Sequence, residues 1–173
     1  GKRVLCCAFT WVACKNLDQK EGSTLHGALG KGIDGECNKK RLKQTAEEYD
    51  VCVVDEVSMI GTDLYTDLMK LKRAGLENFI FVGDFRQLRG VGYEHIDFEK
   101  SRVLKSLAKY NRIELTINKR SNEEMRRLSD QVCKTGKIDL RKYPSKLCTN
   151  NISFTHKKRI AVNHRLMETL KRY

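Results

Sequence analysis

The chain has 173 residues, with 34 lysines and arginines against 22 aspartates and glutamates, so its formal net charge is +12. A chain of this length fits one domain and is long enough to bury a sizeable core. Hydrophobic residues make up 40% and charged residues 32%. No apolar run approaches the roughly 20 residues that a membrane-spanning helix needs, so the composition excludes an integral membrane protein and argues against wholesale disorder.

The cysteines indicate a reduced protein rather than a disulfide framework or a zinc site. There are seven: Cys6, Cys7, Cys14, Cys37, Cys52, Cys133 and Cys148. Their number is odd, no C-x-x-C pair occurs, and no histidine lies at ligand spacing, although a metal role remains the alternative. We therefore expect an intracellular, reducing compartment, with nucleus, cytoplasm and viral replication site left open.

Positive charge gathers in three segments, residues 39–43, 126–137 and 157–172. A phosphate backbone is the usual partner of such an excess, because binding releases counterions. One alternative is that these residues form a solvated face that keeps the protein soluble. Another is that they bind a polyanion other than nucleic acid. Charge alone does not separate these interpretations.

Apolar runs and helical periodicities alternate along the chain, beginning with a predicted buried strand at residues 4–9. Thr10 is placed to cap a helix over residues 11–19. A short second helix is predicted to start at Ser23, and the glycine-rich residues 30–38 are predicted to form a loop or hairpin.

Two further apolar runs, residues 51–54 and 79–82, are predicted to be buried strands. Between them Leu64, Leu68 and Leu71 recur at helical spacing and predict one apolar helix face.

The last third of the chain continues the alternation of helices and strands. A short helix at 103–107 and a strand at 113–116 are predicted first. The next helix begins at the Ser121-x-x-Glu124 capping box and ends at Gly136, and its residues Met125, Leu128 and Val132 are predicted to point inward. A strand at 152–155 and a final helix with an apolar stripe of Val162, Leu166 and Leu170 follow.

Strands that alternate with helices, each strand a continuous apolar run, predict an α/β fold with a mainly parallel sheet flanked by helices. Ligands gather at the carboxyl ends of the strands in such sheets. Those ends carry polar residues, namely Thr10, Asp55, Glu56, Asp84 and Thr116. The chemistry is therefore expected at this edge.

The most informative feature is the pair Asp55-Glu56, which follows four apolar residues. A carboxylate at the end of a rigid strand can hold Mg²⁺ through water, and its neighbour can orient a water that attacks a phosphate. Acidic residues that merely begin a loop are the alternative. The second strand end supports the catalytic interpretation, because Gly83 permits close backbone approach and Gln87 can sense a terminal phosphate.

Taken together, these segments resemble the superfamily one helicases, in particular the RecD-like group that includes the Pif-type DNA helicases. The likeness runs from Val4 to about Met167 and rests on five motifs in order. They are Ala8-Phe9-Thr10-x-x-Ala13 with Thr24-Leu25-His26, Val54-Asp55-Glu56-Val57-Ser58-Met59, Gly83-Asp84-x-x-Gln87-Leu88, Leu115-Thr116-x-Asn118-x-Arg120-Ser121, and Phe154-Thr155-His156-x-x-Arg159-x-x-Val162-Asn163.

The resemblance implies a RecA-like P-loop NTPase motor that uses ATP and Mg²⁺. Residues 1–120 would form the first motor domain without its phosphate loop, and residues 121–173 the connection and the start of the second. It implies that Asp55 holds Mg²⁺ through water, that Glu56 is the general base and that Gln87 senses the γ-phosphate.

Two further residues join the implied nucleotide site. Asp84 would contact the nucleotide, and Arg120 would stabilise the charge that develops during phosphoryl transfer, as an arginine finger does. An ion pair with Glu123 or Glu124 is the alternative for Arg120.

The resemblance also implies nucleic-acid contacts from Thr10, Trp11, Thr24, His26 and Asn163. Core packing is the alternative for Trp11, and a helix-start or core role for His26. The implied partners are single-stranded DNA, duplex junctions and the remainder of the helicase chain, with RNA possible and no membrane. Roles in DNA replication and repair are implied as well.

One departure from the family concerns the phosphate loop G-x-x-x-x-G-K-[ST], which this sequence lacks. We expect that loop upstream of Gly1, and we expect this chain alone to bind ATP weakly or not at all. A nucleic-acid-binding remnant that hydrolyses nothing, and a viral-type RNA helicase, are the competing hypotheses.

Overall fold

The computed structural model describes residues 1–17, 22–87, 89–139 and 155–170. The chain divides into two compact units, Gly1–Asn118 and Lys119–Tyr173. Among the described helices, none combines the length and the apolar character that crossing a bilayer demands.

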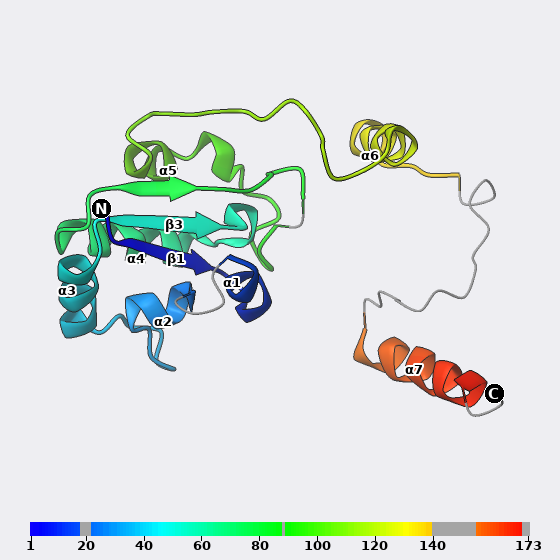
Figure 1. Ribbon diagram of the computed structural model, residues 1–173, viewed down its shortest axis with the longest axis horizontal. Coiled ribbons are helices and arrows are strands. Elements are labelled where there is room, and N and C mark those ends of the chain that lie inside the picture. The colour runs from blue at the N-terminus through cyan, green and yellow to red at the C-terminus, as the bar shows by residue number, and fades with distance from the viewer. Residues whose placement is uncertain (18–21, 88, 140–154, 171–173) are drawn as a thin grey trace. The chain divides into compact units, whose positions relative to one another are not determined.

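The described part of the first unit is built on a parallel sheet of four strands in the order β2-β1-β3-β4. The strands are β1 (Val4–Ala8), β2 (Ser23–Thr24), β3 (Val51–Asp55) and β4 (Phe79–Phe81). Register places Ala8 of β1 opposite Asp55 of β3, so both strands end at the same edge. The arrowheads of β1, β3 and β4 point toward this edge in Figure 1. The predicted α/β fold with a parallel sheet is confirmed.

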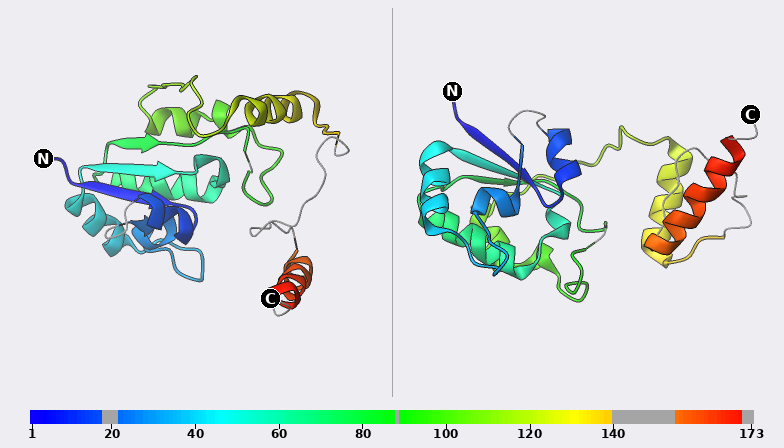
Figure 2. Two further views of the ribbon diagram at one scale, coloured as in Figure 1. Left: turned by 45° about the vertical axis from the view of Figure 1, so that its right-hand side comes forward. Right: turned by 90° about the horizontal axis from the view of Figure 1, so that it is seen from below.

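Helices of the first unit pack mainly as one layer against the sheet. They are α1 (Trp11–Leu17), α2 (Leu25–Leu29), α3 (Lys39–Glu48), α4 (Thr62–Arg73) and α5 (Arg102–Leu107), with 3₁₀ turns η1 (Val57–Met59) and η2 (Phe98–Lys100). Neighbouring members of the set α2 to α5 contact one another, and Figure 2 shows α2, α3 and α4 on one side of the strands.

The predicted apolar face of α4 forms the centre of the core. Leu64, Leu68 and Leu71 are at most 2% exposed, and they pack with Cys52 and Val54, the residues of β3 that alternate toward the helices. Burying one such leucine stabilises the fold by about 1.5–3 kcal/mol.

The opposite face of the sheet is covered less completely than we expected for strands made of continuous apolar runs. Val4 and Ile80 remain 41% and 53% exposed, whereas Cys7 and Val54 on the helical side are fully buried. The strands therefore bury one face fully and the other in part.

Helix α3 was not predicted, because its first turn was interpreted only as a charge cluster. Asn38 begins it, since its side-chain oxygen accepts a hydrogen bond from the Arg41 amide at 3.1 Å. Leu42 and Thr45 face inward, and the buried Thr45 hydroxyl donates to the Ala28 carbonyl at 3.0 Å, which fastens α3 to α2.

Two predictions for the first unit are wrong. Ser23 and Thr24 form the short strand β2 beside Cys7 and Ala8, and the helix begins only at Leu25. Residues 113–116 form no strand among the described residues: the alternation of Ile113 and Leu115 fits a strand, but both side chains are 90% exposed and no described strand pairs with them. Thr116 therefore does not stand at a strand end.

The second unit contains the two predicted helices, α6 (Glu123–Thr135) and α7 (His156–Leu170). Asn122 rather than Ser121 begins α6, because its side-chain oxygen accepts from the Met125 amide, and Gly136 ends the helix in a left-handed conformation. The prediction that Met125, Leu128 and Val132 point inward is wrong, since no residue of α6 is buried. Most of the predicted strand at 152–155 lies outside the described residues.

Candidate functional site

An open cavity of about 660 Å³ lies at the carboxyl edge of the sheet. Its walls come from the segments that follow β1, β3 and β4. The lining residues are Thr10, Val12, Ala13, Asn16, Glu56, Ser58, Met59, Arg86 and Gln87. Three residues predicted to have different roles, Thr10, Glu56 and Gln87, thus surround one cavity, in the position where parallel sheets bind ligands.

Glu56 reaches this cavity through a strained turn. Its backbone has φ 53° and ψ 45°, the left-handed region, which costs a residue other than glycine about 1–2 kcal/mol. The turn is closed by the Glu56 amide, which donates to Asp55 Oδ1 at 2.9 Å, and by the Met59 amide, which donates to the Glu56 carbonyl at 3.0 Å. Backbone strain of this kind concentrates at functional sites.

A close backbone approach at Gly83 brings the Gln87 segment beside the acidic turn. The Val57 amide donates to the Val82 carbonyl at 3.1 Å. Gly83 has φ 154°, and a Cβ there would lie 2.9 Å from the Val57 amide nitrogen. The prediction that glycine permits close approach at this position is confirmed.

Asp84 is engaged by a residue that the sequence analysis did not single out. Arg86 Nε and Nη2 donate to the two Asp84 carboxylate oxygens at 3.0 and 2.9 Å, and the Arg86 amide donates to Oδ1 at 2.9 Å. These hydrogen bonds hold the pKa of Asp84 below its usual value. Asp84 thereby orients Arg86 at the cavity wall, and its predicted contact with a nucleotide stays a prediction. The D-x-R spacing is the signal that could have pointed to Arg86.

Asp55 fits a Mg²⁺ ion that is held mainly by water and phosphate. It is half-buried at the end of β3, and Oδ1 accepts the Glu56 amide. No cluster of three or more potential metal-ligating side chains occurs in the described ranges. Mg²⁺ commonly takes only one or two protein carboxylates and completes its shell with waters and substrate phosphates, so a single aspartate suits this ion.

Helix α1 presents its first turn to solvent at the cavity rim. The Thr10 hydroxyl oxygen accepts from the Ala13 amide at 3.2 Å and caps the helix, as predicted. Trp11 is 59% exposed, and Lys15 Nζ lies 5.9 Å from the centre of its ring. Trp11 is therefore not a core residue, and its exposed position leaves a face of the indole ring available for stacking on a base.

Thr24 and His26 stand at the start of α2, next to the end of β1. The Thr24 hydroxyl oxygen accepts from the Gly27 amide at 3.1 Å, and the exposed His26 ring lies 6.0 Å from the ring of Phe9. Their predicted contacts with nucleic acid stay predictions.

Arg120 and Asn163 belong to the second unit, and both are exposed. Glu123, one of the two alternative partners of Arg120, pairs with Arg126 and Arg127 at 3.8 and 2.6 Å. The roles of Arg120 and Asn163 stay predictions.

The family model of the AAA domain matches residues 1–93, just over half of the chain. The chain belongs to the AAA domain family. Its fold is that of the Pif1 helicase from Candida albicans, with a TM-score of 0.70 at 20% identity over 96% of this chain and 44% of that one. The likeness to Pif-type helicases expected from the sequence is thereby confirmed at the level of the fold.

Two Bacteroides structures are also similar, with a TM-score of 0.43 each. Pif1 in complex with ADP-AlF4 is 22% identical, and Pif1 bound to ssDNA is 21% identical; each match covers 55% of this chain and 25% of that one. A search of curated proteins found no match. The chain spans less than half of the Candida albicans helicase and about a quarter of the Bacteroides proteins.

Proposed function

We propose that this chain is a motor segment of an ATP-dependent DNA helicase, which couples ATP hydrolysis to movement on single-stranded DNA and to duplex unwinding. The observation that carries the proposal is the cavity at the carboxyl edge of the sheet, where Glu56 and Gln87 stand beside Thr10. The AAA domain family and the Pif1 fold support a helicase-type motor.

In this proposal the acidic turn and the Gln87 segment serve the nucleotide. Asp55 holds Mg²⁺, which neutralises phosphate charge, and Glu56 accepts a proton from the attacking water. Gln87 senses the terminal phosphate, and its backbone connection through Gly83 transmits that state to the acidic turn. Arg120 supplies positive charge to the transition state, and the phosphate loop comes from the remainder of the helicase chain.

The nucleic-acid partner is single-stranded DNA, with duplex junctions as the working substrate. Thr10 and Trp11 follow β1, Thr24 ends β2 and His26 lies just after it, and the net charge of +12 favours a polyanion. RNA is the second candidate. An intracellular, reducing location is part of the proposal, and none of the described cysteines forms a disulfide.

Binding of a fluorescently labelled oligo-dT to this chain tests the nucleic-acid half of the proposal. We expect the affinity to fall steeply with added salt, and Trp11→Ala to weaken binding by about 1–3 kcal/mol if the indole stacks on a base. Tyr110→Ala is the matched control, because Tyr110 is also an exposed aromatic residue, at 77%. Salt-independent binding, or equal losses in both variants, would contradict the proposal.

Hydrolysis by the complete protein tests the nucleotide half. Glu56→Gln should abolish ATP turnover and leave nucleotide binding intact, because the amide keeps the shape but accepts no proton. Glu77→Gln, at an exposed glutamate just before β4, is the control. Unchanged turnover in Glu56→Gln removes Glu56 from the mechanism. Strong DNA binding with no turnover in the parent favours the remnant that only binds nucleic acid.

A further inference from the structure

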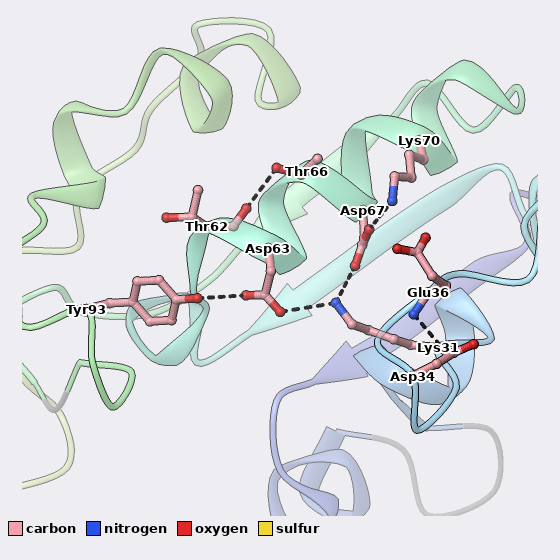
Figure 3. A network of polar contacts seen from close by, with 9 residues as sticks. All are labelled: Lys31, Asp34, Glu36, Thr62, Asp63, Thr66, Asp67, Lys70 and Tyr93. Atoms are coloured by element: carbon pink, nitrogen blue, oxygen red, sulfur yellow. Dashed lines mark hydrogen bonds and ion pairs between the residues drawn. The ribbon is translucent and has the colours of Figure 1, made fainter.

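A cluster of charges outside the cavity joins the loop after α2 to helix α4 (Figure 3). Lys31, whose side chain is 9% exposed, donates from Nζ to Asp67 Oδ2 at 2.6 Å and to Asp63 Oδ2 at 3.1 Å. Asp67, 4% exposed at its side chain, also accepts Lys70 Nζ at 2.8 Å. The Tyr93 hydroxyl donates to Asp63 Oδ1 at 3.3 Å.

The members of this cluster come from the three segments that carry the predicted functional motifs. Lys31 follows the Gly30 cap of α2, and its amide donates to the His26 carbonyl at 2.8 Å. Asp63 lies in the first turn of α4, which η1 links to the acidic turn. Tyr93 lies in the loop that follows Gln87. One lysine just beyond the C-terminal end of α2 thus ties this short helix to helix α4, and through Asp63 to the Gln87 loop.

Stability alone is a weak reason for such an arrangement. The cost of removing two charges from water largely offsets their attraction, so a buried ion pair is often no more stabilising than a hydrophobic pair of similar volume. The ion pair does fix direction and distance, because both Lys31 hydrogen bonds have defined acceptors. The ion pair therefore adds little to the free energy of unfolding but fixes the position of Lys31 relative to α4.

We propose that Lys31 is a positioning residue that holds the short helix α2 from its C-terminal end, and with it Thr24 and His26, in a fixed place relative to the acidic turn. This deepens the proposed function and rests on it. Lys31 acts through α2 and not by touching phosphate, because its ammonium group is enclosed by Asp63 and Asp67.

The double variant Lys31→Met/Asp67→Leu tests the proposal. It removes one positive and one negative charge, so the formal net charge stays at +12, and it leaves no buried lysine without its partner. Lys100→Met/Asp97→Leu is the matched control, since it makes the same substitutions at an exposed ion pair beside η2 with an N···O distance of 3.0 Å, outside the basic segments.

We expect the double variant to bind oligo-dT about three- to tenfold more weakly than the parent, in the range that mutations in coupling networks produce. The dependence of affinity on salt should be unchanged, because no phosphate contact is lost. The control should bind like the parent. Measurements at a temperature where circular dichroism shows both variants fully folded separate positioning from a purely structural role.

Unchanged affinity in the double variant would overturn the proposal, and so would a salt slope that falls by about one, which marks a lost phosphate contact. Amide hydrogen exchange gives a result that needs no nucleic acid. Faster exchange confined to residues 23–31 supports the positioning role even if the parent binds no DNA, in which case only the proposed function fails. Unchanged exchange, or faster exchange that extends to β1 and β3, overturns the positioning role.

Discussion

Glycine at position 56 should stabilise the first unit relative to alanine at the same position. Glu56 adopts φ 53° and ψ 45°. A left-handed backbone costs an L-residue about 1–2 kcal/mol, and glycine avoids this cost. Glycine in turn loses about 0.5–1 kcal/mol more backbone entropy on folding than alanine does. The mid-range values of these two costs predict that Glu56→Gly unfolds with a free energy about 0.8 kcal/mol higher than Glu56→Ala.

Urea denaturation followed by circular dichroism measures this difference, and thermal melting should show a shift of about 2–8 °C in the same direction. Lys43, in the interior of α3, supplies the control, because alanine should there be more stable than glycine by about 1 kcal/mol. The sign of the effect thus reverses between the two positions. Equal stability of Glu56→Ala and Glu56→Gly would refute the left-handed turn, and with it the account of how Glu56 reaches the cavity.

Two more predictions concern the charge cluster and the exposed segment after α5. Burial raises the pKa of Asp67 and of Asp63, but hydrogen bonds from Lys31 outweigh it and leave both pKa values below the usual range. The two ionised carboxylates therefore stabilise the folded state fully above the unfolded pKa of about 3.9, and this stabilisation is lost as the pH falls through the lower pKa of the folded state. The urea midpoint should therefore decline below about pH 4, and less steeply in Lys31→Met/Asp67→Leu. Identical declines in the parent and the variant would contradict this prediction. Ile113 and Leu115, each 90% exposed, should promote self-association at high concentration, and Ile113→Lys/Leu115→Lys should reduce it in sedimentation velocity. The control Ile33→Lys/Val91→Lys alters residues in other loops that are at least as exposed, and an equal effect there would show that the segment at 113–116 has no special role.

The features that could be predicted from the sequence depend on short-range patterns. The runs at 51–54 and 79–82 are apolar throughout, which specifies buried strands without knowledge of their neighbours. The acidic pair follows directly after one of these strands, so its place at the carboxyl edge of the sheet follows from chain order alone.

The features that could not be predicted depend on partners far away in the sequence. Residues 113–116 have the alternation of a strand, but a strand exists only when another backbone pairs with it. Helix α3 was not predicted because lysines and an arginine fill its first turn, although Leu42 and Thr45 are spaced as residues on one buried helix face. Lys31 gave no signal at all, since its acceptors lie 32 and 36 residues away and its burial is set by helix α4.

The distribution of burial explains why the site can tolerate strain. The core around Leu64, Leu68 and Leu71 holds α4 against the sheet with side chains that are almost fully buried. The cavity contributes little to that core, because Glu56 is partly exposed and Gln87 is exposed. Substitutions of Glu56 and Gln87 should therefore change ligand binding without unfolding the protein. The Lys31 cluster outside the cavity differs, because Asp67 is anchored within the buried face of α4 while Asp63 and Tyr93 connect to the functional segments, so in the proposal a change there passes from the core to the site.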